Sequence, residues 1–163
     1  MFLSDYHSHS LVSFDGEASM SAMARAALDA GLNELCITDH CDFLDQDGIP
    51  VRTYDWDKAL DQFDEAEFFQ YRDNFALRLG LELGMPHLDP AAAERICAQP
   101  WLDFVLGSVH NLSPARGGGD FYYVDYSTAA ACREALDDYF SSLFQLAESD
   151  FYDVLVHIIY PLR

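Results

Sequence analysis

The sequence predicts an α/β fold in which parallel strands are covered by helices. Short apolar runs alternate with amphipathic stretches of helical length along the whole chain. Residues that favour helix starts and ends stand at the borders of these stretches. Side chains that can bind metals follow the apolar runs, where the strands would end. A doubly wound sheet and a (β/α) barrel both fit this order of elements.

Five strands and four helices are expected in alternation. Ser19 is a suitable N-cap for the first helix, and Gly31 suits the left-handed conformation that often ends one. Pro90 follows Asp89 at the start of the third helix, where proline is favoured. The expected strands are 2–6, 34–38, 75–81, 102–106 and 152–156, and the expected helices are 20–30, 54–71, 90–98 and 128–148.

Two of these helices carry large apolar side chains at helical spacing, and we expect these side chains to be buried. They are Trp56, Leu60, Phe63, Phe68 and Tyr71 in the second helix, and Cys132, Leu136, Phe140, Leu143, Phe144 and Ala147 in the last.

Length and composition predict a single globular domain, residues 1–163. Of the 163 residues, 50% are hydrophobic, which is enough for a sizeable core. The net charge is -19, and such a charge repels phosphate backbones and anionic lipids while it attracts cations. We therefore expect neither a nucleic-acid partner nor a membrane partner.

The sequence shows no signal peptide and no apolar stretch long enough to cross a bilayer. Its four cysteines lack CxxC spacing, and three of them lie in apolar contexts typical of reduced thiols. A cytoplasmic location is the expectation.

Two histidines, His7 and His9, stand just after the first expected strand. Alternate residues of a strand point to the same face, so the two imidazoles are expected to lie side by side. Imidazole is a common ligand of transition metals. The pair therefore predicts part of a metal site.

Metal-capable side chains also stand at the ends of the other four expected strands. In (β/α) barrels this end of the sheet holds the active site. A single histidine at a strand end more often satisfies a structural hydrogen bond, but the coincidence of five strand ends favours a metal centre. Asp39 is a candidate for orienting a ligand histidine, and Asp15 is either a ligand or a turn residue. The side chains at the four strand ends are those of His40, Glu82, His110 and His157.

This set of ligands exceeds what one ion needs. Imidazoles together with carboxylates suit Zn, Fe or Mn, and we expect two to three divalent ions. Glu82 could bridge two of them. Two ions close together can activate a water and hold both oxygens of a displacement at phosphorus.

Five segments carry these side chains: Asp5-Tyr6-His7-Ser8-His9, Ile37-Thr38-Asp39-His40, Gly80-Leu81-Glu82-Leu83-Gly84, Gly107-Ser108-Val109-His110 and the terminal His157. Together they resemble the successive motifs of the PHP (polymerase and histidinol phosphatase) superfamily. Within it, the chain most resembles the histidinol-phosphatase family, because of Asp15, the Gly-Ser-Val-His motif and the long helix before Glu82. The resemblance extends over the whole chain.

The resemblance implies a distorted (β/α)7 TIM-like barrel with a trinuclear metal centre, of which this chain holds about the first five units. It implies that His7 and His9 bind the first metal and that Glu82 bridges it to the second. His110 and His157 would complete the protein ligands of the second metal.

The same resemblance assigns Asp15 and His40 to the third metal. Glu82, His40 and Asp39 are then the candidate catalytic residues. Arg163 is the candidate for holding the substrate phosphate, because a guanidinium group suits phosphate oxygens.

One family motif, a final Asp-x-His, is missing from this sequence. Seven units of ~30 residues or more each need more than about 200 residues. We therefore expect a C-terminally truncated copy, whose open edge at the fifth strand can pair with another chain. Alternatively, another chain completes the barrel.

The activity that the resemblance implies is hydrolysis of L-histidinol phosphate to L-histidinol and phosphate, a step of histidine biosynthesis. A metal-bridging hydroxide would attack the phosphorus of this small phosphomonoester. One alternative is a phosphodiesterase or exonuclease that acts on nucleotides, although the acidic charge counts against a long nucleic acid. The other is an inactive metal-binding fragment.

Overall fold

The structure of the chain is a computed structural model that describes residues 1–51, 54–69 and 75–162. Strands and helices alternate along it, as the sequence predicts. The elements are β1 (Ser4–Asp5), α1 (Met20–Asp29), β2 (Glu34–Asp42), α2 (Trp56–Ala66), η1 (Glu67–Phe69), β3 (Ala76–Gly84), η3 (Pro86–Leu88), α3 (Pro90–Cys97), β4 (Phe104–Ser108), η4 (Pro114–Arg116), η5 (Phe121–Tyr123), α4 (Ala129–Ala147), β5 (Val154–Leu155) and η6 (Tyr160–Leu162), where η marks a 3-10 helix.

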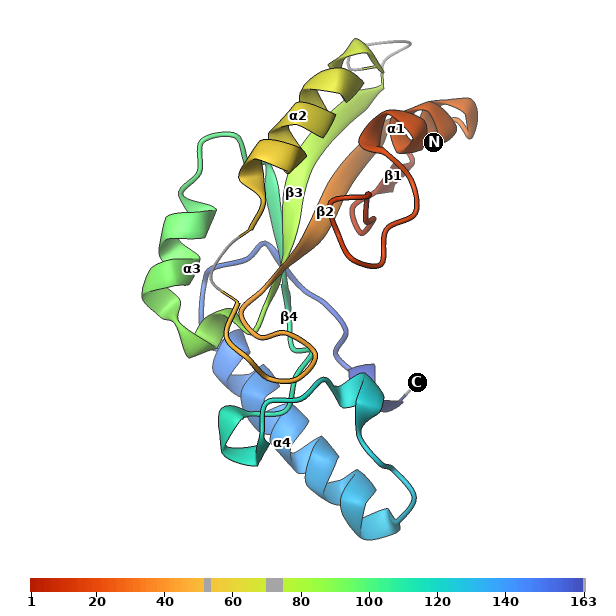
Figure 1. Ribbon diagram of the computed structural model, residues 1–163. Helices are drawn as coiled ribbons and strands as arrows, with labels where there is room; N and C mark the ends of the chain where they lie inside the picture. The colour runs from red at the N-terminus through yellow and green to blue at the C-terminus, as the bar shows by residue number, and fades with distance from the viewer. Residues whose placement is uncertain (52–53, 70–74, 163) are drawn as a thin grey trace. The chain divides into compact units, whose positions relative to one another are not determined.

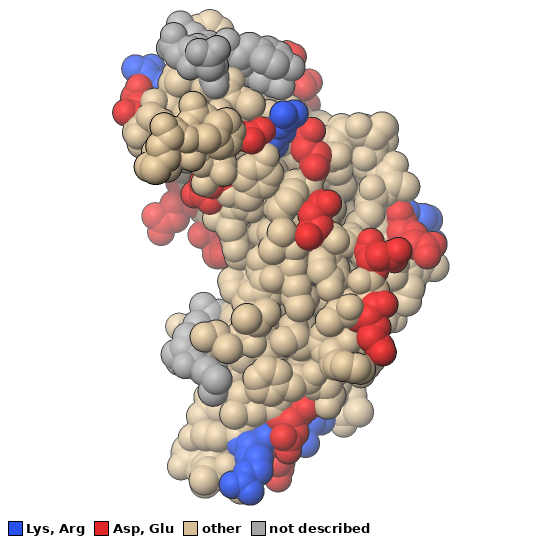
Figure 2. All heavy atoms as spheres, turned by 180° about the vertical axis from the view of Figure 1, so that it is seen from behind, with Lys and Arg blue, Asp and Glu red and all other residues tan. Residues whose placement is uncertain are grey.

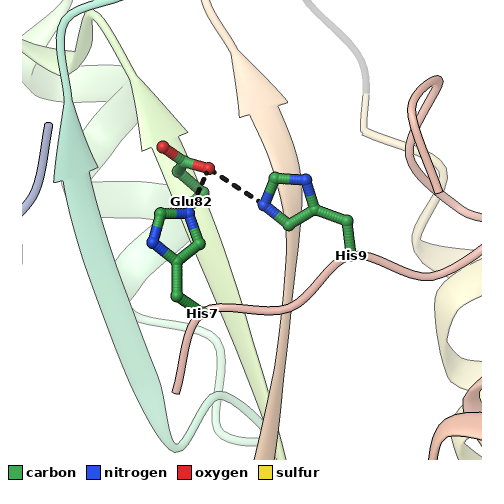
Figure 3. Close-up of side chains that lie close together, drawn as sticks. All are labelled: His7, His9 and Glu82. Carbon is green, nitrogen blue, oxygen red and sulfur yellow. Dashed lines mark hydrogen bonds and ion pairs between the residues drawn. The ribbon is translucent and has the colours of Figure 1, made fainter. Parts of the chain in front are cut away.

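The strands form one sheet in the order β1-β2-β3-β4-β5, so neighbours in the chain are neighbours in the sheet. The pairs β1–β2 and β4–β5 are parallel, and the arrows of β2, β3 and β4 point the same way in Figure 3. A doubly wound sheet reverses its strand order at a switch point, whereas a barrel adds each strand beside the last. The α/β fold is therefore that of successive barrel units.

The chain forms two compact units. The first contains Met1–Cys41, Thr53–Glu82 and Gln99–Val105, and the second contains Asp42–Arg52, Leu83–Ala98 and Leu106–Arg163. In Figure 1, α1 and α2 of the first unit lie beside β2 and β3. The core of this unit is formed by Met20, Ala24 and Ala27 of α1, Leu35 and Ile37 of β2, Ala59 and Ala66 of α2, and Phe75, Leu77 and Leu79 at β3.

Four helices begin where a polar side chain can satisfy their free backbone N–H groups. Ser19, Asp89 and Thr128 cap α1, α3 and α4, each by accepting a bond from a backbone amide. Asp55 does the same for α2. Gly31 follows α1 with a φ of 81°, the left-handed conformation that was expected of it.

The second expected helix is shorter than predicted, because α2 begins after Asp55 and passes into the 3-10 helix η1. Phe68 on η1 is 69% exposed, so the expectation that it is buried was wrong. The change from 3.6 to 3.0 residues per turn rotates later side chains away from the face that α2 buries. Tyr71 lies outside the described residues.

The buried face of α4 also differs from the predicted one. The helix buries Ala135, Tyr139, Ser142 and Leu146 in the second unit, whereas Phe140 and Phe144 are 46% and 65% exposed. Apolar side chains stand on more than one side of α4, so periodicity alone could not select the buried side. In the folded chain the buried residues of α4 each stand one position before an expected one, for example Tyr139 in place of Phe140 and Leu146 in place of Ala147.

Acidic side chains outnumber basic ones on the face shown in Figure 2, in keeping with the net charge of -19. Within the described part of the chain, no helix has the length and apolar character needed to cross a membrane.

Candidate functional site

The segment after β1 is hydrogen-bonded to β2 through Ser8, which stands between His7 and His9. The Ser8 backbone N–H donates to Thr38 Oγ1 at 3.0 Å, its Oγ donates to the Cys36 carbonyl at 3.0 Å, and its carbonyl accepts from the Thr38 N–H at 2.8 Å. While Ser8 bonds to β2, the imidazoles of its two neighbours both point toward Glu82 (Figure 3), although all three residues lie beyond the end of β1 at Asp5. The imidazole rings of His7 and His9 lie side by side, with centroids 5.4 Å apart.

Both imidazoles converge on one carboxylate of β3. Nε2 of His7 and Nε2 of His9 each lie 3.0 Å from the same oxygen, Oε2 of Glu82 (Figure 3). The Glu82 side chain is completely buried. A buried carboxylate is costly unless cations or hydrogen-bond donors surround it, so Glu82 gives this cluster a strong preference for positive charge.

Asp15 and His40 extend the cluster on the far side of His9. Nδ1 of His9 lies 3.1 Å from both carboxylate oxygens of Asp15, and Nε2 of His40 lies 3.5 Å from Asp15 Oδ2. The rings of His9 and His40 are in edge contact, with centroids 4.3 Å apart. His7, His9 and Glu82 form one group of possible metal ligands, and His9, Asp15 and His40 form another.

The hydrogen bonds of the two ring nitrogens of His9 indicate whether a metal ion fits here. An ionised carboxylate only accepts hydrogen bonds, so a neutral His9 donates its Nδ1–H to Asp15 and leaves a lone pair on Nε2. That lone pair faces Oε2 of Glu82 at 3.0 Å, and Nε2 is buried without a hydrogen bond of good geometry. Two acceptors facing each other favour a cation between them.

The distances and the charge agree with such a cation. Two ligand atoms that each lie about 2.1 Å from one ion are about 3 Å apart at a right angle and about 3.4 Å apart at a tetrahedral angle, so the 3.0 Å between Nε2 and Oε2 is close to the separation of two ligands of one ion. Burial would lower the pKa of His9, but the nearby carboxylates of Glu82 and Asp15 outweigh it and raise that pKa. The carboxylates thus stabilise a positive charge at this imidazole, and a divalent ion can supply that charge.

Asp39 has a different place from the one expected of it. Its buried carboxylate accepts from the Ser10 N–H at 2.6 Å, from Ser10 Oγ at 2.7 Å and from Ser13 Oγ at 2.8 Å. Ser13 Oγ also accepts from the His40 backbone N–H at 2.8 Å. Asp39 therefore holds the loop between His9 and Asp15 instead of a histidine ring.

Gly16 closes the same loop. A Cβ at this position would meet the Ser10 carbonyl oxygen at 1.8 Å, so no larger residue fits without moving the backbone. The loop that carries Asp15 is thus defined from both ends, by the Asp39 carboxylate and by the close approach of Gly16.

The second unit contains another pair of metal-capable histidines. His110 follows β4, and its Nδ1 lies 2.9 Å from Oδ1 of Asp42, the last residue of β2. His157 follows β5 with a φ of 55°, which is rare for a residue other than glycine. The rings of His110 and His157 are 5.5 Å apart, and both contact the ring of Tyr160.

A buried tyrosine holds His157 in this conformation. The Tyr139 hydroxyl of α4 donates to the His157 carbonyl, and the Tyr139 side chain is fully buried. A backbone conformation of this kind costs of order 1–3 kcal/mol and persists only where its surroundings enforce it.

The structure thus brings His7, His9, Asp15, His40 and Glu82 together in the first unit, and His110 and His157 together in the second. Arg163, the expected phosphate ligand, lies outside the described residues. The sequence motifs point to neither Asp42 nor the loop serines Ser10 and Ser13, which only the structure places at the site. The sequence does contain a signal for Asp42. It stands two residues after His40, just as His9 stands two residues after His7.

Known proteins resemble most or nearly all of this chain. A protein of Deinococcus radiodurans named "Probable histidinol-phosphatase" is 31% identical, and the match covers 99% of this chain and 62% of that protein. The "Histidinol-phosphatase" of Lactococcus lactis is 29% identical over 72% of this chain and 44% of its own length. The chain therefore spans about three fifths of the length of the first of these relatives.

A crystal structure of histidinol phosphate phosphatase from Lactococcus lactis, complexed with Zn, L-histidinol and phosphate, has the same fold. It superposes with a TM-score of 0.71 at 26% identity, and the match covers 98% of this chain and 59% of that one. The family model that matches is the PHP domain, over residues 5–163. With the histidines and acids of its motifs gathered as described above, the chain belongs to the PHP domain family.

Proposed function

We propose that this chain forms the metal-binding part of a phosphomonoesterase that hydrolyses L-histidinol phosphate to L-histidinol and phosphate, as in histidine biosynthesis. The observation that carries the proposal is the convergence of His7 Nε2 and His9 Nε2 on the buried Oε2 of Glu82, each at 3.0 Å. Support for this substrate comes from the relatives named histidinol-phosphatase and from the Lactococcus lactis structure that contains L-histidinol and phosphate.

In this proposal His7, His9 and Glu82 hold one divalent ion, and Asp15 and His40 hold another. Zn, Mn and Fe all suit imidazole and carboxylate ligands, and two to three ions are expected. Bound ions of this kind polarise a phosphoryl group and lower the pKa of water. The described residues supply the rest: Glu82 provides a buried negative charge, and Asp39 keeps the Asp15 loop in place.

His110 and His157 are proposed ligands in the second unit, and Arg163 remains the proposed phosphate ligand. The acidic surface favours a small phosphomonoester over a nucleic acid, because it offers few cations to a phosphate backbone. A cytoplasmic location and pairing through the β5 edge remain predictions.

The test is phosphate release from L-histidinol phosphate by the 163-residue chain, loaded in turn with Zn and Mn. We expect turnover that a chelator abolishes and that added metal restores. His9→Ala and Glu82→Gln should each reduce turnover by at least about 100-fold, since each removes a ligand atom from a preorganised site. Arg25→Ala, which removes an exposed side chain of α1, is the control and should leave turnover unchanged.

A diester substrate separates this proposal from its main alternative. Faster hydrolysis of bis-p-nitrophenyl phosphate than of L-histidinol phosphate would favour a phosphodiesterase. Absence of any turnover, with one ion or none bound per chain, would contradict the proposal and favour an inactive metal-binding fragment.

A further inference from the structure

Asp42 contacts Nδ1 of His110, a histidine that can bind metal through its other nitrogen. Neither the sequence motifs nor the similar proteins assign a role to Asp42. We propose that Asp42 is a positioning residue, which fixes the tautomer and the direction of the His110 ring so that Nε2 is presented to a metal ion. This inference rests on the proposed metal-dependent function. It concerns residues of the second unit only.

The contact is direct and largely shielded from water. Nδ1 of His110 lies 2.9 Å from Oδ1 of Asp42, and the two side chains are 7% and 16% exposed. An exposed pair of this kind contributes little, because water competes for both partners. Here the His110 side chain is buried, so the hydrogen bond can determine how the ring is oriented.

The chemistry of the two groups determines which nitrogen carries the proton. An ionised carboxylate has no proton to give, so Nδ1 of a neutral His110 must be the donor. The lone pair then lies on Nε2, at the opposite edge of the ring. Ligand histidines in metal sites commonly donate their other N–H to a carboxylate in this manner, which orients the ring and strengthens it as a ligand.

A glycine on β3 makes room for this contact. A Cβ at Gly84 would lie 1.8 Å from Asp42 Oδ1 and 3.3 Å from His110 Nδ1. The φ of Gly84 lies outside the left-handed region, so an alanine is strained here by contact and not by backbone conformation. Gly84 therefore allows the carboxylate to reach the ring, and it offers a second way to disturb the pair.

A hydrogen bond also fixes the backbone of His110. The His110 carbonyl accepts from the Phe121 N–H at 2.9 Å, and the Phe121 side chain is 1% exposed. With the backbone fixed there and Nδ1 fixed by Asp42, the imidazole has little freedom left. Metal binding then needs little further ordering of this ligand, which favours affinity.

The first measurement is the tautomer of His110 in the metal-free chain, read from the ring nitrogen shifts of 15N-histidine-labelled protein at a pH where the ring is neutral. We expect the Nδ1–H tautomer in the natural chain and a mixture of tautomers in Asp42→Ala. Asp42→Asn keeps an acceptor oxygen but loses the charge, so it should restore the Nδ1–H tautomer in part. A purely structural role for Asp42 would not produce this order.

The second measurement is zinc affinity, from competition with a chelator of known affinity. Loss of a carboxylate behind a ligand histidine typically lowers metal affinity by about 10- to 100-fold, and we expect a loss in that range for Asp42→Ala. Gly84→Ala should give a similar loss while it removes no polar group. Asp47→Ala removes an equal charge from an exposed position in the same unit and should change affinity by less than about twofold.

The double variant Asp42→Ala/Gly84→Ala decides whether the two single changes act through the same contact. If they do, the double variant binds zinc as Asp42→Ala does, because the clash has nothing left to displace. If Asp42→Ala fails to fold, Asp42→Asn and Gly84→Ala carry the same test.

An unchanged His110 tautomer, or a zinc affinity within about twofold of the natural chain in Asp42→Ala or Gly84→Ala, would overturn the inference. A loss in Asp47→Ala equal to that in Asp42→Ala would do the same, since it would show a general effect of charge. Failure of the proposed function looks different. It would appear as absent phosphate release in the natural chain, while the tautomer and the zinc affinity still respond to Asp42.

Discussion

Replacement of Asp39 by alanine tests whether a buried carboxylate holds the loop that carries Asp15. Asp39 is 0% exposed and accepts three short hydrogen bonds, from the Ser10 N–H, the Ser10 hydroxyl and the Ser13 hydroxyl, at 2.6, 2.7 and 2.8 Å. Asp39→Ala leaves all three donors without this acceptor.

The expected loss can be estimated from these contacts. Hydrogen bonds to a charged group contribute about 1.5–3 kcal/mol each, but the buried carboxylate also carries a desolvation cost. The two hydroxyls can turn to other acceptors, whereas the Ser10 N–H cannot. We therefore expect Asp39→Ala to lower the free energy of unfolding by about 3–5 kcal/mol, the sum of the three hydrogen bonds less the desolvation cost that the carboxylate no longer carries.

Asparagine separates charge from shape at this position. Asp39→Asn keeps one acceptor oxygen for the Ser10 N–H and the Ser13 hydroxyl, and the Ser10 hydroxyl can rotate to accept from the new amide. Hydrogen bonds without charge are about half as strong, so we expect a loss of about 1–2 kcal/mol. The predicted order of stability is therefore natural chain, asparagine, alanine.

The assay is urea unfolding followed by tryptophan fluorescence. Trp56 and Trp101 both belong to the first unit and contact each other, with ring centroids 5.8 Å apart, so their signal reports on the unit that contains Asp39. Asp61→Ala on α2 removes an equal charge from an exposed position and should change the free energy by less than about 0.5 kcal/mol. A loss below about 1 kcal/mol in Asp39→Ala, or one equal to that of Asp61→Ala, would refute the reasoning.

Gly16→Ala should weaken zinc binding and phosphate release together, because its Cβ would meet Ser10 O at 1.8 Å and must move the Asp15 loop by roughly 1 Å or more. Gly119→Ala is the control, because its Cβ has no neighbour nearer than 3.7 Å, and it should change neither zinc binding nor phosphate release. Zinc binding and phosphate release that stay unchanged in Gly16→Ala would contradict this view of the loop. On α4, Leu146→Ala should cost about 2–5 kcal/mol in urea unfolding, and Phe144→Ala less than about 1 kcal/mol. Equal costs would mean that the helix buries both faces.

The fold could be predicted from the sequence because each of its signals is local. Ser19, Asp89 and Thr128 act on backbone amides a few residues away, and they cap helices as expected. Strand ends were harder to predict. We expected the second strand to end at Thr38, whereas β2 continues to Asp42. Thr38 to Asp42 are held by neighbouring strands and loops, and such contacts are not visible in the segment itself.

That boundary explains why Asp42 was missed. The expected strand 34–38 excludes His40 and Asp42, whereas in the structure both belong to β2, where alternate residues can share a face. The buried side of α4 was misjudged for a related reason. Its apolar residues allow more than one orientation, and only the packing around Tyr139 and Leu146 decides between them.

The sequence by itself determined the chemical character of the site. His7 and His9 stand at strand spacing, and the other metal-capable side chains follow later strands, so the residue types and their order were sufficient to predict a metal-binding α/β protein. The tertiary structure decided which atoms meet. Glu82 presents one oxygen to two imidazoles, Asp39 holds a loop instead of a histidine, and Asp42 stands behind His110. These contacts join residues far apart in the chain, and their distances depend on how strands pair and loops pack, which no local pattern encodes.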